Sequence, residues 1–316
     1  MKLPDLAVSI NNLTKIYNDS SGKNRKKALD SINLNVPRGS FFGLLGPNGA
    51  GKSSLINIMA GLVKKTSGSV SIWNHDIDRD ERLSRCAIGV VPQELNLDPF
   101  FTAREILEVQ AGLYGVPKSE RKTEDILNAV NLIEKADVYS RTLSGGMRRR
   151  LLIAKAMVHS PPILVLDEPT AGVDIELRQT LWGSMKEMNS RGATILLTTH
   201  YLEEAEELCD EIAIINNGRI VACDEKDKLI RRFDSKNIIM ILSEPISEIP
   251  ESIKKFKPSI ISDNRLKITY KPSEGVVGQV FSLVQESGLR ILDVVTEEAD
   301  LNDVFLKLTR ENQKIL

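Results

Sequence analysis

The sequence predicts an α/β fold followed by a smaller α+β unit. Three observations support this prediction. Short apolar runs alternate with stretches of helical periodicity over about the first 230 residues. The runs are apolar throughout, which is typical of parallel strands that helices cover on both faces. The pattern changes near Phe233, so we expect one domain over residues 1–233 and an accessory domain over residues 234–316.

The expected elements of the first domain follow in chain order. The buried parallel strands are predicted at Ala7–Ile10, Phe41–Leu45, Ile163–Leu166, Thr194–Thr198 and Ile212–Ile215. The helices are predicted at Ser53–Ala60, Ala103–Tyr114, Glu124–Val130, Gly145–Val158, Ile175–Asn189 and Glu203–Cys209. The polar segment Asn18–Lys27 is expected to be a surface loop. In the second domain we expect strands at Ile238–Leu242, Leu266–Tyr270 and Leu289–Val295, and helices at Val276–Ser287 and Leu301–Thr309.

Composition excludes several classes of protein. The chain has 42 Lys and Arg against 43 Asp and Glu, a net charge of −1, which argues against nucleic acid as a partner bound by bulk charge. No stretch approaches the ~18 uncharged apolar residues of a membrane-spanning helix. The N-terminus, with Pro4 and Asp5, does not resemble a signal peptide. The sequence therefore predicts a cytoplasmic protein, and its three scattered cysteines are expected to be thiols in a reducing compartment.

A glycine-rich segment provides the strongest functional signal. Residues Gly46–Ser53 read GPNGAGKS, which matches G-x-x-x-x-G-K-S/T, and lie directly between an expected strand and an expected helix. The glycines allow a tight loop whose N–H groups point inward, at a helix N-terminus that favours anions. Lys52 would supply a charge to the β- and γ-phosphates, and Ser53 a hydroxyl ligand for Mg²⁺.

Two carboxylates follow a buried strand. Asp167 and Glu168 come directly after Ile163–Leu166. Ligands of an open α/β sheet bind at the carboxyl ends of its strands, so both side chains are expected at the phosphate site. We expect Asp167 to hold Mg²⁺ and Glu168 to accept a proton from, or orient, an attacking water.

A third motif makes the pattern specific. Leu143–Met147 read LSGGM at the start of an expected helix, where Ser144 is a good N-cap and Gly145 and Gly146 leave N–H groups open for an anion. Together with the two preceding motifs, it resembles the nucleotide-binding subunit of ATP-binding cassette (ABC) transporters, over residues 7 to about 230. LSGGMRRR and PTAGVD resemble the exporter-like ABC-2 branch, and the arginine run is expected on a solvated helix face.

The resemblance implies a phosphate-loop ATPase core with an inserted helical subdomain at about 94–160. It implies roles for four further residues. Tyr17 would stack on adenine, Gln93 would reach Mg²⁺ and the attacking water, and His200 would touch the γ-phosphate. Asp174 would lie in the dimer-contact loop at the nucleotide. The residues expected to bind nucleotide through the loop are Gly46, Pro47, Asn48, Gly49, Ala50, Gly51, Lys52, Ser53 and Ser54.

The resemblance also implies partners. Two copies would sandwich ATP between the loop of one and Ser144–Met147 of the other, and a separate membrane permease would convert dimer opening into export. The chain would sit on the cytoplasmic face of the membrane, bound to the permease. The alternative is a soluble ABC ATPase acting on a ribosome, repair or assembly complex. The single cassette, with only 116 residues from Lys52 to Glu168 (168 − 52), favours transport.

Overall fold

The computed structural model describes residues 3–18, 25–173, 175–232, 236–246, 248–256, 258–270, 275, 277–298, 301–302, 304–305 and 308. The chain divides into two compact units, residues 1–225 and residues 226–316. The division lies eight residues before the boundary expected at Phe233, because helix α8 (Lys226–Arg232) groups with the second unit.

The first unit is built on a six-stranded sheet in the order β10-β9-β3-β8-β7-β6. Strands β9, β3, β8, β7 and β6 are parallel, and β10 pairs antiparallel with β9. The bounds are β3 (Phe41–Leu45), β6 (Ile88–Val91), β7 (Ile163–Asp167), β8 (Thr194–Thr199), β9 (Glu211–Asn216) and β10 (Arg219–Glu225). All residues of β3 and β8 are buried, as expected for central strands covered on both faces. The carboxyl ends of the central parallel strands therefore define the edge where a ligand binds.

A second sheet has the order β2-β1-β4-β5 and is antiparallel. Its strands are β1 (Leu6–Asn18), β2 (Arg25–Pro37), β4 (Ser67–Ile72) and β5 (His75–Asp76). The expectation of a parallel strand at Ala7–Ile10 is therefore wrong, since β1 pairs antiparallel on both sides. The segment Asn18–Lys27 was expected to be a loop, but Asn18 is the last residue of β1 and Arg25–Lys27 are the first residues of β2. Residues 19–24 lie outside the described part. The alternation of apolar and polar residues over 32–36 signals β2, which the sequence reasoning missed.

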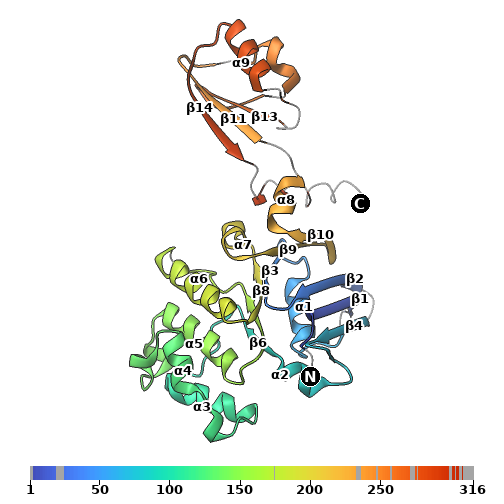
Figure 1. Ribbon diagram of the computed structural model, residues 1–316, viewed down its shortest axis with the longest axis vertical. Helices are drawn as coiled ribbons and strands as arrows, with labels where there is room; N and C mark the ends of the chain where they lie inside the picture. Colours follow the sequence, from blue (N-terminus) through green and yellow to red (C-terminus); the bar gives the residue numbers. More distant parts are fainter. Residues whose placement is uncertain are drawn as a thin grey trace. The chain divides into compact units, whose positions relative to one another are not determined.

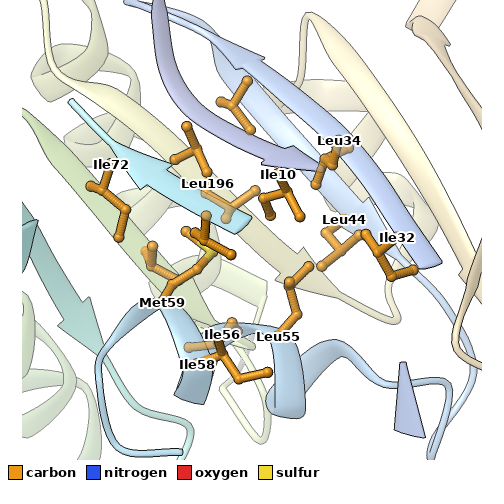
Figure 2. Packing of buried hydrophobic residues seen from close by; sticks show 14 of the residues in the cluster. Ile10, Ile32, Leu34, Leu44, Leu55, Ile56, Ile58, Met59, Ile72 and Leu196 are labelled. Atoms are coloured by element: carbon orange, nitrogen blue, oxygen red, sulfur yellow. The ribbon is translucent and has the colours of Figure 1, made fainter. Parts of the chain in front are cut away.

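Helix α1 (Lys52–Met59) and the two sheets contribute side chains to one hydrophobic core (Figure 2). Ile10, Ile32 and Ile72 come from the antiparallel sheet, and Leu44 and Leu196 from the parallel sheet. The apolar side of α1 supplies Leu55, Ile56, Ile58 and Met59. Because this helix follows the glycine-rich loop, the same packing that buries it also fixes the loop.

The other helices of this unit are α2 (Glu81–Cys86), α3 (Ala103–Leu113), α4 (Thr123–Ala129), α5 (Gly145–Met157), α6 (Ile175–Ser190) and α7 (Leu202–Leu208), with short 3₁₀ turns at Lys118–Glu120, Ile133–Lys135 and Ser140–Thr142. Helices α3, α4 and α5 pack on one another and gather on the side of the unit opposite β1, β2 and β4 (Figure 1). Helix α3 begins with a capping box, in which Thr102 and Glu105 exchange hydrogen bonds with each other's N–H groups. Helices α3 to α7 match the expected ranges to within one residue at each end, whereas α2 was not predicted.

The second unit carries a four-stranded antiparallel sheet in the order β12-β13-β11-β14. Its strands are β11 (Lys236–Leu242), β12 (Ser259–Ser262), β13 (Arg265–Tyr270) and β14 (Ile291–Glu298). Helix α9 (Val277–Glu286) and the 3₁₀ turn Glu251–Phe256 pack with this sheet around a separate core, which includes Ile238, Leu266 and Val280. The helix expected at Leu301–Thr309 falls largely outside the described residues.

Candidate active site

The glycine-rich loop connects β3 to α1 in a conformation that depends on two glycines. A Cβ on Gly46 would lie 2.4 Å from the carbonyl oxygen of Ile215, so no side chain fits there. Gly51 has φ +116°, and a Cβ on it would lie 2.6 Å from the carbonyl oxygen of Ala28. Helix α1 begins at the next residue, and its first N–H groups are therefore presented at the loop.

Lys52 is the first residue of α1, and it is only 6% exposed. Its Nζ donates to the carbonyl oxygens of Gly46 at 2.6 Å and Pro47 at 3.3 Å. Burial lowers the pKa of Lys52, and the nearby charges of Glu168 and Asp167 raise it in part. The ammonium is thus held inside the loop, where it can face an anion.

The loop lines a cavity of about 510 Å³. This volume is within the ~300–1,000 Å³ range of small-molecule sites. Side chains distant in sequence join the loop there, namely those of Tyr17, Gln93, Glu168 and His200. The structure therefore brings together most of the residues expected to handle nucleotide.

The side chain of Glu168 contacts two other expected site residues. Its Oε2 accepts a hydrogen bond from Gln93 Nε2 at 2.9 Å and lies 3.2 Å from Nδ1 of His200. Glu168 is 8% exposed, and its backbone adopts φ +47°, a left-handed conformation that costs a non-glycine residue about 1–3 kcal/mol. Strain of this kind persists only where the surrounding structure fixes it.

Asp167 lies at the end of β7 and binds its neighbour on β8. Thr198 Oγ1 donates to Asp167 Oδ1 at 2.6 Å. Burial raises the pKa of Asp167, and the hydrogen bond from Thr198 lowers it in part. Thr198 is a residue that sequence reasoning did not single out, although a polar residue at the end of an apolar strand is a usable signal.

The arginine run on α5 does not form the expected solvated face. Arg149 is 4% exposed, and its guanidinium donates to the carbonyl oxygens of Pro92 at 3.0 Å and Gln93 at 2.9 Å. Arg150 donates to the carbonyl oxygens of Val130 and Asn131, both at 3.0 Å. Arg149 therefore fixes the backbone that carries Gln93, a role that spacing along the chain could not indicate.

The LSGGM segment lies apart from the cavity. Ser144 caps α5, accepting a hydrogen bond from the N–H of Met147 at 3.2 Å. Ser144 and Gly145 are exposed and Gly146 is buried. None of these three residues lines the cavity around Lys52. Asp174 lies outside the described residues.

Tyr17 borders the cavity and is 37% exposed. Its hydroxyl is 3.4 Å from Oγ of Ser54, and the Nζ of Lys15 lies 4.6 Å from the centre of its ring. Lys26, opposite Tyr17 in the β1–β2 pairing, also lines the cavity. Sequence reasoning did not single out Lys26. The signal that could have indicated it is its position at the basic end of the segment Asn18–Lys27.

Comparisons with known proteins agree with this geometry. A family model for "ABC transporter" matches residues 29–171. Nod factor export ATP-binding protein I of Ralstonia nicotianae is 33% identical over 305 residues, which are 96% of this chain and 93% of that protein. The chain belongs to the ABC transporter family. This ABC transporter ATPase is also 34% identical over 293 residues to the linearmycin resistance ATP-binding protein LnrL of Bacillus subtilis, covering 90% of the chain and 94% of that relative.

Solved structures show the same fold. An ATP-binding subunit of an ABC transporter has a TM-score of 0.64 at 30% identity, covering 72% of this ATPase and 93% of that chain. A dimeric ATP-binding cassette bound to ADP and Pi has a TM-score of 0.61 at 29% identity, covering 69% and 98%. The ABC transporter ATPase thus binds and hydrolyses ATP as a transporter subunit, and the relatives favour this function over a soluble machine. Among its described residues, no helix is both long and apolar enough to cross a bilayer.

Proposed function

We propose that this ABC transporter ATPase drives export of a substrate through a separate membrane permease, on the cytoplasmic face of the membrane. Its relatives include proteins named for Nod factor export and linearmycin resistance, each matched over at least nine-tenths of this chain. We assign ATP chemistry to residues 1–233, with the helical subdomain at about 94–160, and an accessory role to residues 234–316.

The pairing of Gln93 and His200 on one oxygen of Glu168 is the observation that carries the catalytic proposal. A carboxylate that lines the cavity beside the glycine-rich loop and is contacted by two side chains suits a general base for water. Gln93 then orients the attacking water, and His200 contacts the γ-phosphate. Tyr17 stacks on adenine, and residues 46–54 hold the phosphates through their N–H groups and Lys52.

Mg²⁺ fits the donor set beside this pair. Ser53, Gln93 and Asp167 offer hydroxyl, amide and carboxylate oxygens, and Mg²⁺ prefers oxygen ligands with only one or two carboxylates. We propose that these three residues hold the ion together with ATP. When bound, it neutralises charge that develops on the phosphates.

ATP-dependent dimerisation accounts for the exposed LSGGM segment. Ser144 and Gly145 lie at the N-terminus of α5 and are open to solvent, and Gly145 has no atom within 4 Å of the position of its missing Cβ. We propose that Ser144, Gly145, Gly146 and Asp174 bind the ATP held by a second copy. Helix N-termini from both copies would then stabilise its negative charge, and hydrolysis would release the link.

A groove beside α3 and α5 is our candidate for permease docking. It has a volume of about 530 Å³ and is lined mainly by apolar surface, including Val90, Tyr114 and Leu152. Large apolar side chains are exposed in the same part of the unit, with Leu62 75% and Leu113 78% accessible. Exposed apolar groups of this kind are typical of protein interfaces.

Substitution of Glu168 tests the catalytic proposal. Glu168→Gln should reduce kcat by at least ~100-fold because the amide cannot accept a proton, while ATP binding and the ATP-induced dimer are retained. Lys52→Ala should instead weaken ATP binding itself. Glu203→Gln, which changes an exposed carboxylate on α7, is the matched control and should leave kcat unchanged. Hydrolysis by Glu168→Gln at the wild-type rate would show that Glu168 is not the base.

A further inference from the structure

Glu204 is a fully buried carboxyl group close to the active site. It lies on α7, four positions after His200, and has 0% exposure. Its Oε1 accepts a hydrogen bond from Thr170 Oγ1 at 2.9 Å and another from Trp182 Nε1 at 3.1 Å. Glu204 therefore joins three segments, namely α7, the turn that follows β7, and α6.

Burying a carboxyl group is costly unless its hydrogen bonds compensate for the lost water. Burial raises the pKa of Glu204, and hydrogen bonds from neighbouring hydroxyls and Trp182 lower it in part. An apolar side chain at this position would fill space without this penalty. Only a polar side chain can accept the hydrogen bonds of Thr170 and Trp182, which both go to Oε1 of Glu204.

Two of the three segments that Glu204 joins carry residues that meet at the cavity, namely the turn after β7 and the segment that leads into α7. Thr170 is fully buried and lies two positions after Glu168, and Glu204 lies four positions after His200. The same two segments also meet where Glu168 Oε2 is 3.2 Å from His200 Nδ1. The Thr170–Glu204 hydrogen bond and the Glu168–His200 contact therefore connect the same two segments at two points.

The backbone conformation of Glu168 also depends on the turn that follows it. Its φ of +47° is unfavourable for a side chain that is not glycine, so the local chain would relax if the following turn were free. The N–H of Ala171 bonds the carbonyl oxygen of Glu168 at 3.2 Å, which closes the turn, and Thr170 lies inside that turn. Anchoring Thr170 consequently fixes the direction in which Glu168 points.

We propose that Glu204 is a positioning residue, which holds Glu168 against His200 by anchoring Thr170. Glu204 is fully buried and does not line the cavity. The inference rests on the proposed roles of Glu168 and His200 in hydrolysis. It predicts that the Thr170–Glu204 bond affects the chemical step rather than nucleotide affinity.

The test compares Thr170→Val with a matched deletion elsewhere in the same unit. Thr123 is also a buried threonine, and its hydroxyl donates to Glu108 in the α3–α4 region. Thr170→Val should lower kcat for ATP about tenfold, the equivalent of one lost hydrogen bond to a charged group, with the ATP Kd and KM unchanged. Thr123→Val should lower the thermal midpoint comparably and leave kcat at the wild-type value.

Conservative variants separate positioning from loss of folding. Thr170→Ser keeps the hydroxyl and Glu204→Gln keeps an acceptor oxygen, so both should retain kcat within about threefold. Glu204→Leu removes the acceptor and should lower kcat as Thr170→Val does. If the hydroxyl and the carboxyl act as one unit, the double variant Thr170→Val/Glu204→Leu should lose no more activity than either single variant.

Two results would overturn the inference in distinguishable ways. If Glu168→Gln and His200→Ala abolish hydrolysis but Thr170→Val lowers only the thermal midpoint, as Thr123→Val does, the bond is structural and the inference fails alone. If Glu168→Gln and His200→Ala hydrolyse ATP at the wild-type rate, the proposed roles fail and the inference fails with them.

Discussion

Replacing Arg149 with methionine should both destabilise the ATPase and slow it. The guanidinium donates to the carbonyl oxygens of Pro92 and Gln93 from a position that is 4% exposed. Methionine fills a similar space but leaves both carbonyl groups without this donor. The perturbation therefore loosens the backbone of Gln93 without touching the cavity directly.

The magnitude follows from two opposing contributions. Hydrogen bonds from a charged donor contribute about 1.5–3 kcal/mol each, so two are worth about 3–6 kcal/mol. Removal of a buried charge recovers part of this, and burial indeed lowers the pKa of Arg149. We expect a net loss of about 2 kcal/mol. This loss is equivalent to a fall in Tm of about 4–8 °C for a domain of this size.

Arg150→Met is the matched control, because Arg150 lies next on α5 and also donates to two carbonyl oxygens, those of Val130 and Asn131. Both variants should lower the midpoint of thermal unfolding measured by circular dichroism. Only Arg149→Met should also reduce kcat, by about tenfold, in a steady-state phosphate-release assay. The reasoning is refuted if Arg149→Met keeps the wild-type kcat, or if Arg150→Met slows hydrolysis equally.

Three further changes should separate packing, titration and ligand contacts. Gly46→Ala should lower Tm and abolish ATP binding, because the added Cβ meets a carbonyl oxygen. Gly183→Ala, in an exposed part of α6, should instead raise the free energy of unfolding in urea by about 0.5–1 kcal/mol. Equal changes in stability for the two variants would contradict this. Burial lowers the pKa of His159, which stacks on Tyr114, so the folded protein binds fewer protons than the unfolded chain. Stability should therefore fall as the pH drops below about 6.5. His159→Phe should reduce this pH dependence in thermal melts from pH 7.5 to 5.5. Tyr17→Ala should weaken ATP binding about 5- to 100-fold by calorimetry, whereas Tyr17→Phe should keep the affinity because the hydroxyl contact at 3.4 Å is weak; loss in both would argue against stacking.

Local patterns anticipated much of the fold. Helix α3 and strand β3 begin at the residues expected, because a capping box and an apolar run bounded by polar residues act over a few positions. The direction of β1 was not anticipated, since its short apolar start reads alike in parallel and antiparallel sheets. The half-buried position of His159 could not be read from the sequence, because it depends on distant residues: the ring stacks on Tyr114 and its Nε2 lies 3.2 Å from the carbonyl oxygen of Ile88.

The sequence by itself determined the glycine-rich loop, the two carboxylates at the end of β7 and the LSGGM cap, because each is a contiguous motif whose chemistry depends on neighbouring residues. Only the tertiary structure decided how these motifs are held. Gln93 reaches Glu168 across 75 positions of the chain, Arg149 fixes the carbonyl oxygen of Gln93, and Glu204 anchors the turn after Glu168. These contacts form between elements distant in sequence, and their residues become recognisable only when the sheet and helices bring them within hydrogen-bonding distance.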